Sequence, residues 1–393
     1  MSEPAVTGQP TLQTANGTLG ATHNSSSAAS FKSATSSSAK QPTDTPATNA
    51  AVSAGEEQEP WTAPAGVLKV PIDRPVASAH PAKVDGLTDE QKVKYQTVLD
   101  SVKEWTTIPA TTAKTAAQVP LHDYERMWLT RDNLLRYLRA TKWNTRQALT
   151  RLQSTLSWRR EYGADNFSHE YISPENETGK QVQLGFDKDA RPVLYLNPAK
   201  QNTKMSDRQI HHLCYMLDRT LDMLPAGQEK TCLVINFKGA GTGNVPSMGQ
   251  ARAVLNILQG HNPERLGRAL ISELPWYVTT FFKVISPFID PVTKEKMKFN
   301  EDLSIYIPAE QLWNHHGGDL NFEYDHSAYW PAFDKACTER RTAYRERWEK
   351  AGKQIGEHED YLRGGAHPSI ASESQAQEPV TDEVTEGVSK LAV

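Results

Sequence analysis

The 393-residue chain has few cysteines, no excess of charge of one sign and no long apolar run. Its three cysteines, Cys214, Cys232 and Cys337, are scattered without a CxxC or Cys/His spacing, so neither a disulfide framework nor a zinc site is implied. The formal net charge of −4 gives no reason to expect nucleic acid as a partner. The N-terminus lacks the basic and apolar regions of a signal peptide, and no segment has the roughly 20 apolar residues that span a bilayer. We therefore expect a soluble or peripheral protein of a reducing compartment.

The familiar enzyme motifs are missing as well. The chain contains no GxSxG, HExxH or Walker sequence, and the pairs His211–His212 and His315–His316 are adjacent, so two histidines of a pair cannot share one face of a helix. The glycines of Gly239–Gly243 fail the dinucleotide spacing, because the third glycine comes one residue early and no acidic residue follows about 20 residues later. A Ser/His/Asp system assembled in space stays open, but no pattern supports it.

Apolar residues are unevenly distributed along the chain. Residues 1–65 are rich in Ser, Thr, Ala, Gly, Pro and Gln, and residues 365–393 repeat this composition with Glu and Asp added, so both read as disordered tails. The middle supports a packed core. We assign a helical N-terminal extension to residues 66–165, the main domain to residues 166–330, and a C-terminal helix that packs on the core to residues 331–364.

Helix start signals divide the extension. Ordered structure is expected to begin near Leu87, where Thr88–Gln91 matches a capping box. Two further helices are predicted, one from Arg131 to about Ala140 and one that opens at Asn144. Together they make a small all-helical subdomain.

The main domain shows short apolar runs typical of strands. We expect strands at residues 182–186, 192–196, 231–237, 269–272 and 304–307. Helical patterns separate them: one opens at the capping box Ser206–Gln209 and ends before Pro225, and another follows Ser247. The run Cys232–Ile235 is continuously apolar, as in a buried strand of a mainly parallel sheet. The predicted fold class is therefore α/β.

The most apolar segment runs from Trp276 to Ile289, in which only Lys283 is charged. A stripe of apolar residues recurs there at helical spacing: Val278, Phe281, Phe282, Ile285 and Ile289. Such an amphipathic helix lies against a protein core or against a membrane surface. The helix pattern alone leaves both readings open.

Polar residues flank this helix on both sides. Glu264 and Arg265 precede it, and Asp290, Thr293 and Lys296 follow it. A lysine supplies a point charge for phosphate, a threonine hydroxyl can donate beside it, and carboxylates accept hydrogen bonds from polyol hydroxyls. This inventory suits a phosphoinositol head group; the alternative is that these residues are solvated or ion-paired.

Several motifs in register resemble the CRAL-TRIO lipid-binding family with its N-terminal helical extension. In chain order they are LLRYLRATKW, WRREYG, DARPVLYL, VINFKG, PERLGRALISELPW, SPFIDPVTKEK and PAEQLWNHHGGDL, from about Thr130 to Leu320. Within that family the chain is most similar to the fungal phosphatidylinositol transfer proteins of the pleiotropic drug resistance branch. The resemblance implies a mainly parallel sheet that floors a hydrophobic pocket, and a mobile gate helix that closes the pocket over one lipid.

The resemblance also implies roles for single residues. The family's phosphatidylinositol head-group positions correspond to Glu264, Arg265, Asp290, Thr293, Lys296 and Lys142. Its gate helix and acyl pocket fall on Trp276, Phe281, Phe282, Ile285 and Phe288, and its pocket strand on Thr231 and Leu233. The chain departs from the family twice. Thr141 stands where LRARK members have a basic residue, and Leu233 replaces a hydroxyl residue, which argues against phosphatidylcholine and favours an apolar second ligand such as sterol.

We therefore predict a phosphatidylinositol-binding and transfer protein that moves lipid between membranes or presents it to lipid kinases, without covalent chemistry, cofactor or metal. It is expected in the cytoplasm, peripheral to the endoplasmic reticulum, lipid droplets or the plasma membrane. Three alternatives stay open: a sterol-transfer protein of the same fold, an α/β enzyme acting on a hydrophobic substrate, and a sensor whose tails recruit a partner.

Overall fold

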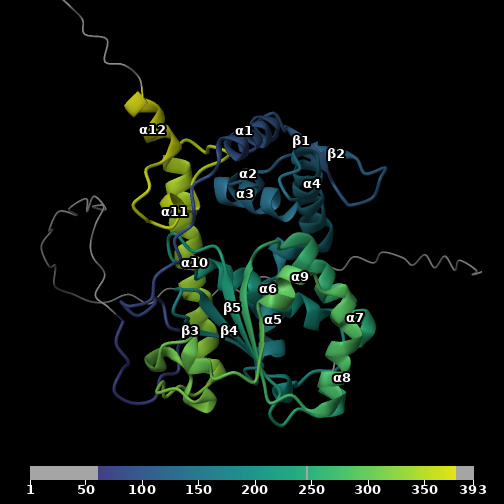
Figure 1. The fold of residues 1–393 in the computed structure, drawn as a ribbon, viewed down its shortest axis with the longest axis vertical. Coiled ribbons are helices and arrows are strands. Elements are labelled where there is room, and N and C mark those ends of the chain that lie inside the picture. The colour runs from purple at the N-terminus through teal and green to yellow at the C-terminus, as the bar shows by residue number, and fades with distance from the viewer. Residues whose placement is uncertain (1–60, 245–246, 378–393) are drawn as a thin grey trace, which may run out of the picture. The chain divides into compact units, whose positions relative to one another are not determined.

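The computed structural model describes residues 61–244 and 247–377 (Figure 1). Most of the predicted tails lie outside these ranges. Packing begins earlier than the expected start at Leu87, because Ile72 and Val76 are buried and Leu68 forms a β-bridge with Phe322. These long-range contacts carry no local signal, so helix start patterns could not reveal them.

The N-terminal subdomain is largely helical, as predicted. Its helices are α1 (Asp89–Lys103), α2 (Asp123–Trp128), α3 (Arg131–Ala140) and α4 (Thr145–Tyr162). The predicted capping box at Thr88 is present with both of its hydrogen bonds, and the Asn144 side chain caps α4. An antiparallel pair of short strands, β1 (Thr107–Pro109) and β2 (Gln118–Pro120), lies between α1 and α2 and was not predicted.

A five-stranded sheet forms the centre of the main domain. Its strands are β3 (Gln181–Phe186), β4 (Pro192–Leu196), β5 (Thr231–Asn236), β6 (Leu266–Ser272) and β7 (Met297–Phe299), in that spatial order. Only β3 and β4 pair in antiparallel fashion, so the prediction of a mainly parallel sheet is confirmed. The strand predicted at residues 304–307 is wrong. Leu303–Ile305 forms a 3₁₀ turn opened by Asp302, and the fifth strand is β7.

Further helices follow the N-terminal subdomain along the chain: α5 (His169–Asn176), α6 (Asp207–Asp222), α7 (Met248–Leu255), α8 (Trp276–Ile285), α9 (Pro291–Glu295), α10 (His326–Lys350), α11 (Glu359–Leu362) and α12 (Ile370–Gln377). Ser206 precedes α6 as predicted, but its side chain makes no capping hydrogen bond. In Figure 1, α10 runs alongside β3, whereas α7 and α8 lie together beyond β5. Helix α12 falls within the segment that composition assigned to a disordered tail.

The strand register shows which side chains share a face of the sheet. Leu194, Leu233 and Ala269 are neighbours on adjacent strands and therefore point to the same side. Helix α6 packs on this side over β3 and β4, since His212 contacts Gln181. Helix α8 lies on the same side near β7. The opposite face is covered by loops that include Trp313, whose ring meets that of Tyr195.

Between α6 and α8 the sheet is only partly covered. Cys232 and Val234 of β5 are fully buried on the far face, but Leu233 and Ile235 on the near face are half-buried although β5 is the central strand. Apolar side chains of α7, α8, the segment after α8 and the start of β7 form their own cluster, separate from the main core: Ala251, Ile285 and Ile289, joined by Leu255, Phe281, Phe282 and Met297. We call the near face of β4 and β5, with Leu196, Leu233 and Ile235, the apolar floor.

Candidate functional site

A charged lip lies at the edge where β6 and β7 begin. We define the lip as Glu264, Asp290 and Lys296. Glu264 sits in the turn before β6 with a left-handed backbone (φ 62°), and Lys296 ends α9 directly before β7. Because β6 and β7 are parallel neighbours, their starting ends lie at the same edge of the sheet. The structure thereby brings together residues that are separated by the whole gate segment in the sequence.

Electrostatics connects the members of the lip. Burial lowers the pKa of Lys296, and the nearby carboxylates of Glu264 and then Asp290 partly oppose that shift. Lys230 and Arg191 also lie close enough to lower the pKa of Lys296. Sequence reasoning missed these two cations because they precede strands far from the motif. A half-buried ammonium ion among other cations is suited to bind an anionic group.

Asp290 and Thr293 also have a structural role in α9. The Asp290 side chain accepts a hydrogen bond from the backbone N–H of Thr293 at 2.8 Å, and Pro291 occupies the first helical position. This short helix fixes the position of Lys296, which directly follows its last residue. The sequence DPVTKEK therefore builds the support of the lip, whether or not Thr293 also touches a ligand.

Arg265, the neighbour of Glu264, is directed into the protein. Its guanidinium donates to the backbone carbonyl of Glu229 at 3.0 Å and lies 3.6 Å from Glu359. Glu359 is also bound by Arg136 at 2.7 Å and lies 3.6 Å from Arg363. We call these five residues the buried ionic network. Arg265 is thus not brought to the lip, and its expected contact with a head group stays a prediction.

Burial has different net effects on the pKa values of Arg265 and Glu359 in this network. It lowers the pKa of Arg265 to about 10, with the neighbouring Arg136 adding to the effect. Burial alone would raise the pKa of Glu359, but Arg136, Arg265 and Arg363 hold that pKa well below its usual range. The carboxylate of Glu359 is therefore ionised and compensates three guanidinium groups.

Lys142 is exposed in the tight turn after α3, with φ 52°. Arg139, in the last turn of α3, pairs with Glu229 at 2.9 Å, and Lys230 is the next residue along the chain. The end of α3 therefore docks near the cations that surround Lys296. Thr141, which replaces a basic residue, donates its hydroxyl to the carbonyl of Tyr137 at 2.9 Å. A contact of Lys142 with a ligand stays a prediction.

Thr231 and Leu233 occupy successive positions on the same face of β5, but their environments differ. Thr231 is buried, and its hydroxyl donates to the carbonyl of Arg265 at 3.3 Å, so the protein itself satisfies this group. Leu233 is half-buried on the apolar floor. The floor thus offers an incoming ligand apolar surface rather than a free hydroxyl.

Helix α8 has an inner and an outer face. Ile285 is buried, and the half-buried Phe281 and Phe282 pack with it, as the helical stripe predicted. Two residues assigned to the pocket point elsewhere: Trp276 is 78% exposed and Phe288 is 48% exposed, with the guanidinium of Arg252 over its ring. Helix α8 and the segment that follows it therefore present aromatic side chains to solvent.

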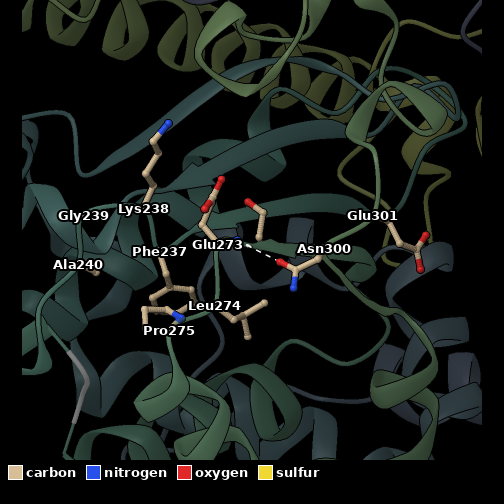
Figure 2. Close-up of a pocket in the computed structure, with 10 residues that line it drawn as sticks. Phe237, Lys238, Gly239, Ala240, Glu273, Leu274, Pro275, Asn300 and Glu301 are labelled. Atoms are coloured by element: carbon tan, nitrogen blue, oxygen red, sulfur yellow. Dashed lines mark hydrogen bonds between the residues drawn. The ribbon is translucent and has the colours of Figure 1, made fainter.

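A separate open pocket of about 710 Å³ lies where β5 and β6 end, at the base of α8 (Figure 2). Figure 2 shows Asn300 bonded to Glu273, whose backbone N–H donates to the Asn300 side chain at 3.1 Å. Tyr277 of α8 donates its hydroxyl to the carbonyl of Ala240 on the other wall. At about 3.3 Å per residue, the length of β6 puts this pocket on the order of 20 Å from the lip. The pocket thus lies at the N-terminal end of α8, away from the lip.

Two glycines of the family motifs lie where close packing leaves no room for a side chain. A Cβ on Gly267 of PERLG would lie 2.5 Å from Nε of Arg191, and one on Gly318 of GGDL would collide with the backbone carbonyl of Leu312. Both positions require close approach of another part of the chain. Their place in the motifs thus follows from folding rather than from ligand contact.

Comparisons with known proteins address the family directly. A profile of the CRAL/TRIO domain matches residues 176–318, and one of the CRAL/TRIO N-terminal domain matches residues 94–154. The phosphatidylinositol transfer protein PDR17 of Saccharomyces cerevisiae is 36% identical over 77% of this chain and 91% of its own length. The chain belongs to the CRAL-TRIO family. The predicted CRAL-TRIO fold with an N-terminal subdomain is thereby confirmed.

Two further comparisons concern a longer relative and a solved structure. A CRAL-TRIO domain-containing protein of Schizosaccharomyces pombe is 48% identical over 77% of this chain, which spans only 30% of that protein. The crystal structure of Sfh5 aligns with a TM-score of 0.43 and 16% identity over 56% of this chain and 83% of that chain, and the family assignment does not depend on it. Among the described residues, none of the helices is both long and apolar enough to cross a membrane.

Proposed function

We propose that this CRAL-TRIO protein binds phosphatidylinositol and transfers it between membranes. The observation that supports this most is the lip of Glu264, Asp290 and Lys296, which lies at the edge of a sheet whose near face is an open apolar floor. The ammonium group would bind the phosphodiester, and the carboxylates would accept hydrogen bonds from inositol hydroxyls. Similarity to PDR17 supports the same cargo.

The energetics of the cargo determines the route of exchange. Two acyl chains contain about 30 methylenes, and at about 0.8 kcal/mol each their transfer into water costs about 25 kcal/mol. Release into water is therefore too slow to be useful. Exchange takes place at a bilayer while α8 moves away from the floor, and no covalent bond changes.

The outer face of the gate supplies the membrane contact in this proposal. Trp276, Val284, Phe288 and Val292 are exposed large apolar residues on α8 and the segment that follows. Lys283 is exposed among them and would contact anionic head groups. Aromatic side chains beside a cation suit the interface between head groups and acyl chains. Presentation of the lipid to a kinase would use the same opened state.

A double substitution tests the head-group site. Glu264→Lys together with Lys296→Ala should reduce transfer of labelled phosphatidylinositol between vesicles at least tenfold. The control is Lys294→Ala, which removes an exposed lysine from the same short helix and should leave transfer unchanged. Undiminished transfer by a folded double variant would overturn the proposed site.

The cargo can be identified without any substitution. Mass spectrometry of lipid extracted from the purified protein should find phosphatidylinositol. Recovery of sterol in its place would move the proposal to sterol transfer, and a chemically altered lipid would indicate an enzyme.

A further inference from the structure

We propose that His358, His367 and Glu373 form a zinc site that fastens α12 to the turn before α11. This inference is independent of the proposed lipid. His358 precedes α11, Glu373 lies in the first turn of α12, and His367 belongs to the loop between these helices. One ligand atom from each residue lies within 4.8 Å of the other two.

The spacing suits a shared ion. Nε2 of His358 lies 3.9 Å from one oxygen of Glu373, and Nδ1 of His367 lies 3.8 Å from the other. In a tetrahedral site, a zinc–nitrogen bond of about 2.0 Å and a zinc–oxygen bond of about 2.1 Å put the two donor atoms about 3.4 Å apart. Nε2 of His358 and its carboxylate oxygen need to approach by about half an ångström, which side-chain rotation supplies, and the His367 distance places the ring of that residue beside the same carboxylate.

Only side-chain rotation is required. The two imidazole rings stack with centroids 3.7 Å apart, and they must open for both to bind one ion. The side chains of His367 and Glu373 are 39% and 38% exposed, so both have room to turn. The side chain of His358 is only 13% exposed and is held in place by its neighbours. Nδ1 of His367 lies 2.9 Å from the Pro368 carbonyl, which can only accept, so this nitrogen carries the proton. The lone pair lies on Nε2, which becomes the ligand when the ring turns.

The surrounding hydrogen bonds hold the backbone of the site in place. The buried carboxylate of Glu357 accepts from the backbone N–H of His358 at 2.9 Å and from that of Ile370 at 3.1 Å. The carboxylate of Asp360 accepts from the backbone N–H of His367 at 2.8 Å. These hydrogen bonds fix the backbone from which the two histidine side chains project.

The donor set selects the ion. Two imidazole nitrogens and one carboxylate oxygen suit Zn²⁺, whereas Mg²⁺ and Ca²⁺ prefer oxygen ligands alone and soft ions prefer thiolates. A fourth position would be taken by water. Since Glu359 of the buried ionic network follows His358 directly, a bound ion would also stiffen the segment that pairs with Arg265.

Zinc titration of the full-length protein tests the proposal. After removal of metal with EDTA and dialysis, isothermal titration with ZnCl₂ should show one saturable equivalent per chain, and Co²⁺ should give visible d–d absorption. His367→Ala and Glu373→Gln should each weaken Zn²⁺ binding at least tenfold. His80→Ala, which removes an exposed histidine elsewhere, should leave binding unchanged.

A second readout keeps the test informative if His367→Ala fails to fold. Zn²⁺ should raise the Tm of the wild-type protein and slow proteolysis within residues 365–377, but do neither in Glu373→Gln, whose side chain is partly exposed. Absence of saturable binding, or equal binding by wild type and Glu373→Gln, would overturn the site. Lipid transfer is scored separately, so loss of the zinc proposal leaves the lipid proposal intact.

Discussion

Glu264 and Arg265 are adjacent in one motif and belong to two different regions. Glu264 is part of the half-exposed lip, where its charge acts on Lys296. Arg265 turns inward and joins Glu359 in the buried ionic network, which connects α3, the turn before β5 and α11. Residues that a motif groups together can therefore serve unrelated purposes.

The difference lies in solvation. Ion pairs with access to water add little to stability, because water screens them, so the lip can be altered at low cost to the fold. Charges removed from water are costly unless each is compensated, so loss of one member of a buried network leaves its partners unpaired. The network should thus govern stability, and the lip should govern ligand binding.

The largest expected effect is on the network. Glu359→Gln should destabilise the protein by about 3–5 kcal/mol in urea unfolding, because it removes the carboxylate shared by three buried guanidinium groups, of which Arg136 keeps its pair with Glu229. Glu323→Gln, which neutralises an exposed carboxylate near Lys69, is the control and should cost less than about 0.5 kcal/mol. Equal stability of the two variants would remove the distinction between network and surface.

The loss of stability caused by Glu359→Gln depends on pH. The pKa of Glu359 is lowered in the folded protein, so its contribution is fully present above the unfolded glutamate value of about 4.3 and is lost as pH falls below it. The stability difference between wild type and Glu359→Gln should therefore be constant from about pH 7 to about pH 5 and shrink as the pH falls toward about 3. Unfolding curves across this range measure it.

An intermediate effect is expected at the junction of the two regions. Arg265→Lys keeps a charge but loses the planar fork that reaches both Glu229 and Glu359, so it should cost about 1–2 kcal/mol in unfolding free energy. Transfer should fall less than in the Glu264→Lys, Lys296→Ala double variant, because Glu264 is displaced rather than removed. A loss of transfer as large as in that double variant, with unchanged stability, would instead put Arg265 on the ligand.

The smallest expected effect is on how lipid transfer depends on pH through the charge of Lys296 in the lip. Because the pKa of Lys296 is lowered, its positive charge should be lost at a lower pH than for an ordinary lysine, and transfer should decline with it. Lys296→Arg should transfer normally near pH 7 and retain activity further into the alkaline range, since arginine stays charged. Coincident profiles between pH 7 and pH 10 would show that this charge does not limit binding.

Local signals explain which elements were predicted correctly. The caps at Thr88 and Asn144 depend on residues three positions apart, and the strand at residues 192–196 is a compact apolar run. Strand β7 has only three residues and exists because it pairs with β6, so no local pattern marks it. The apolar residues near Leu303 have the sequence pattern of a strand, but they form a turn that packs into the core.

The sequence by itself determined the family, the α/β class, the apolar stripe of the gate and the chemical types available for a head group, because these depend on residue identity and short spacing. Only the tertiary structure decided which charges meet. It brought Glu264 to Lys296, turned Arg265 toward Glu359, and gathered His358, His367 and Glu373. The physical reason is that electrostatic and coordination partners are selected by distance in space and by burial, and both are set by the packing of the whole chain.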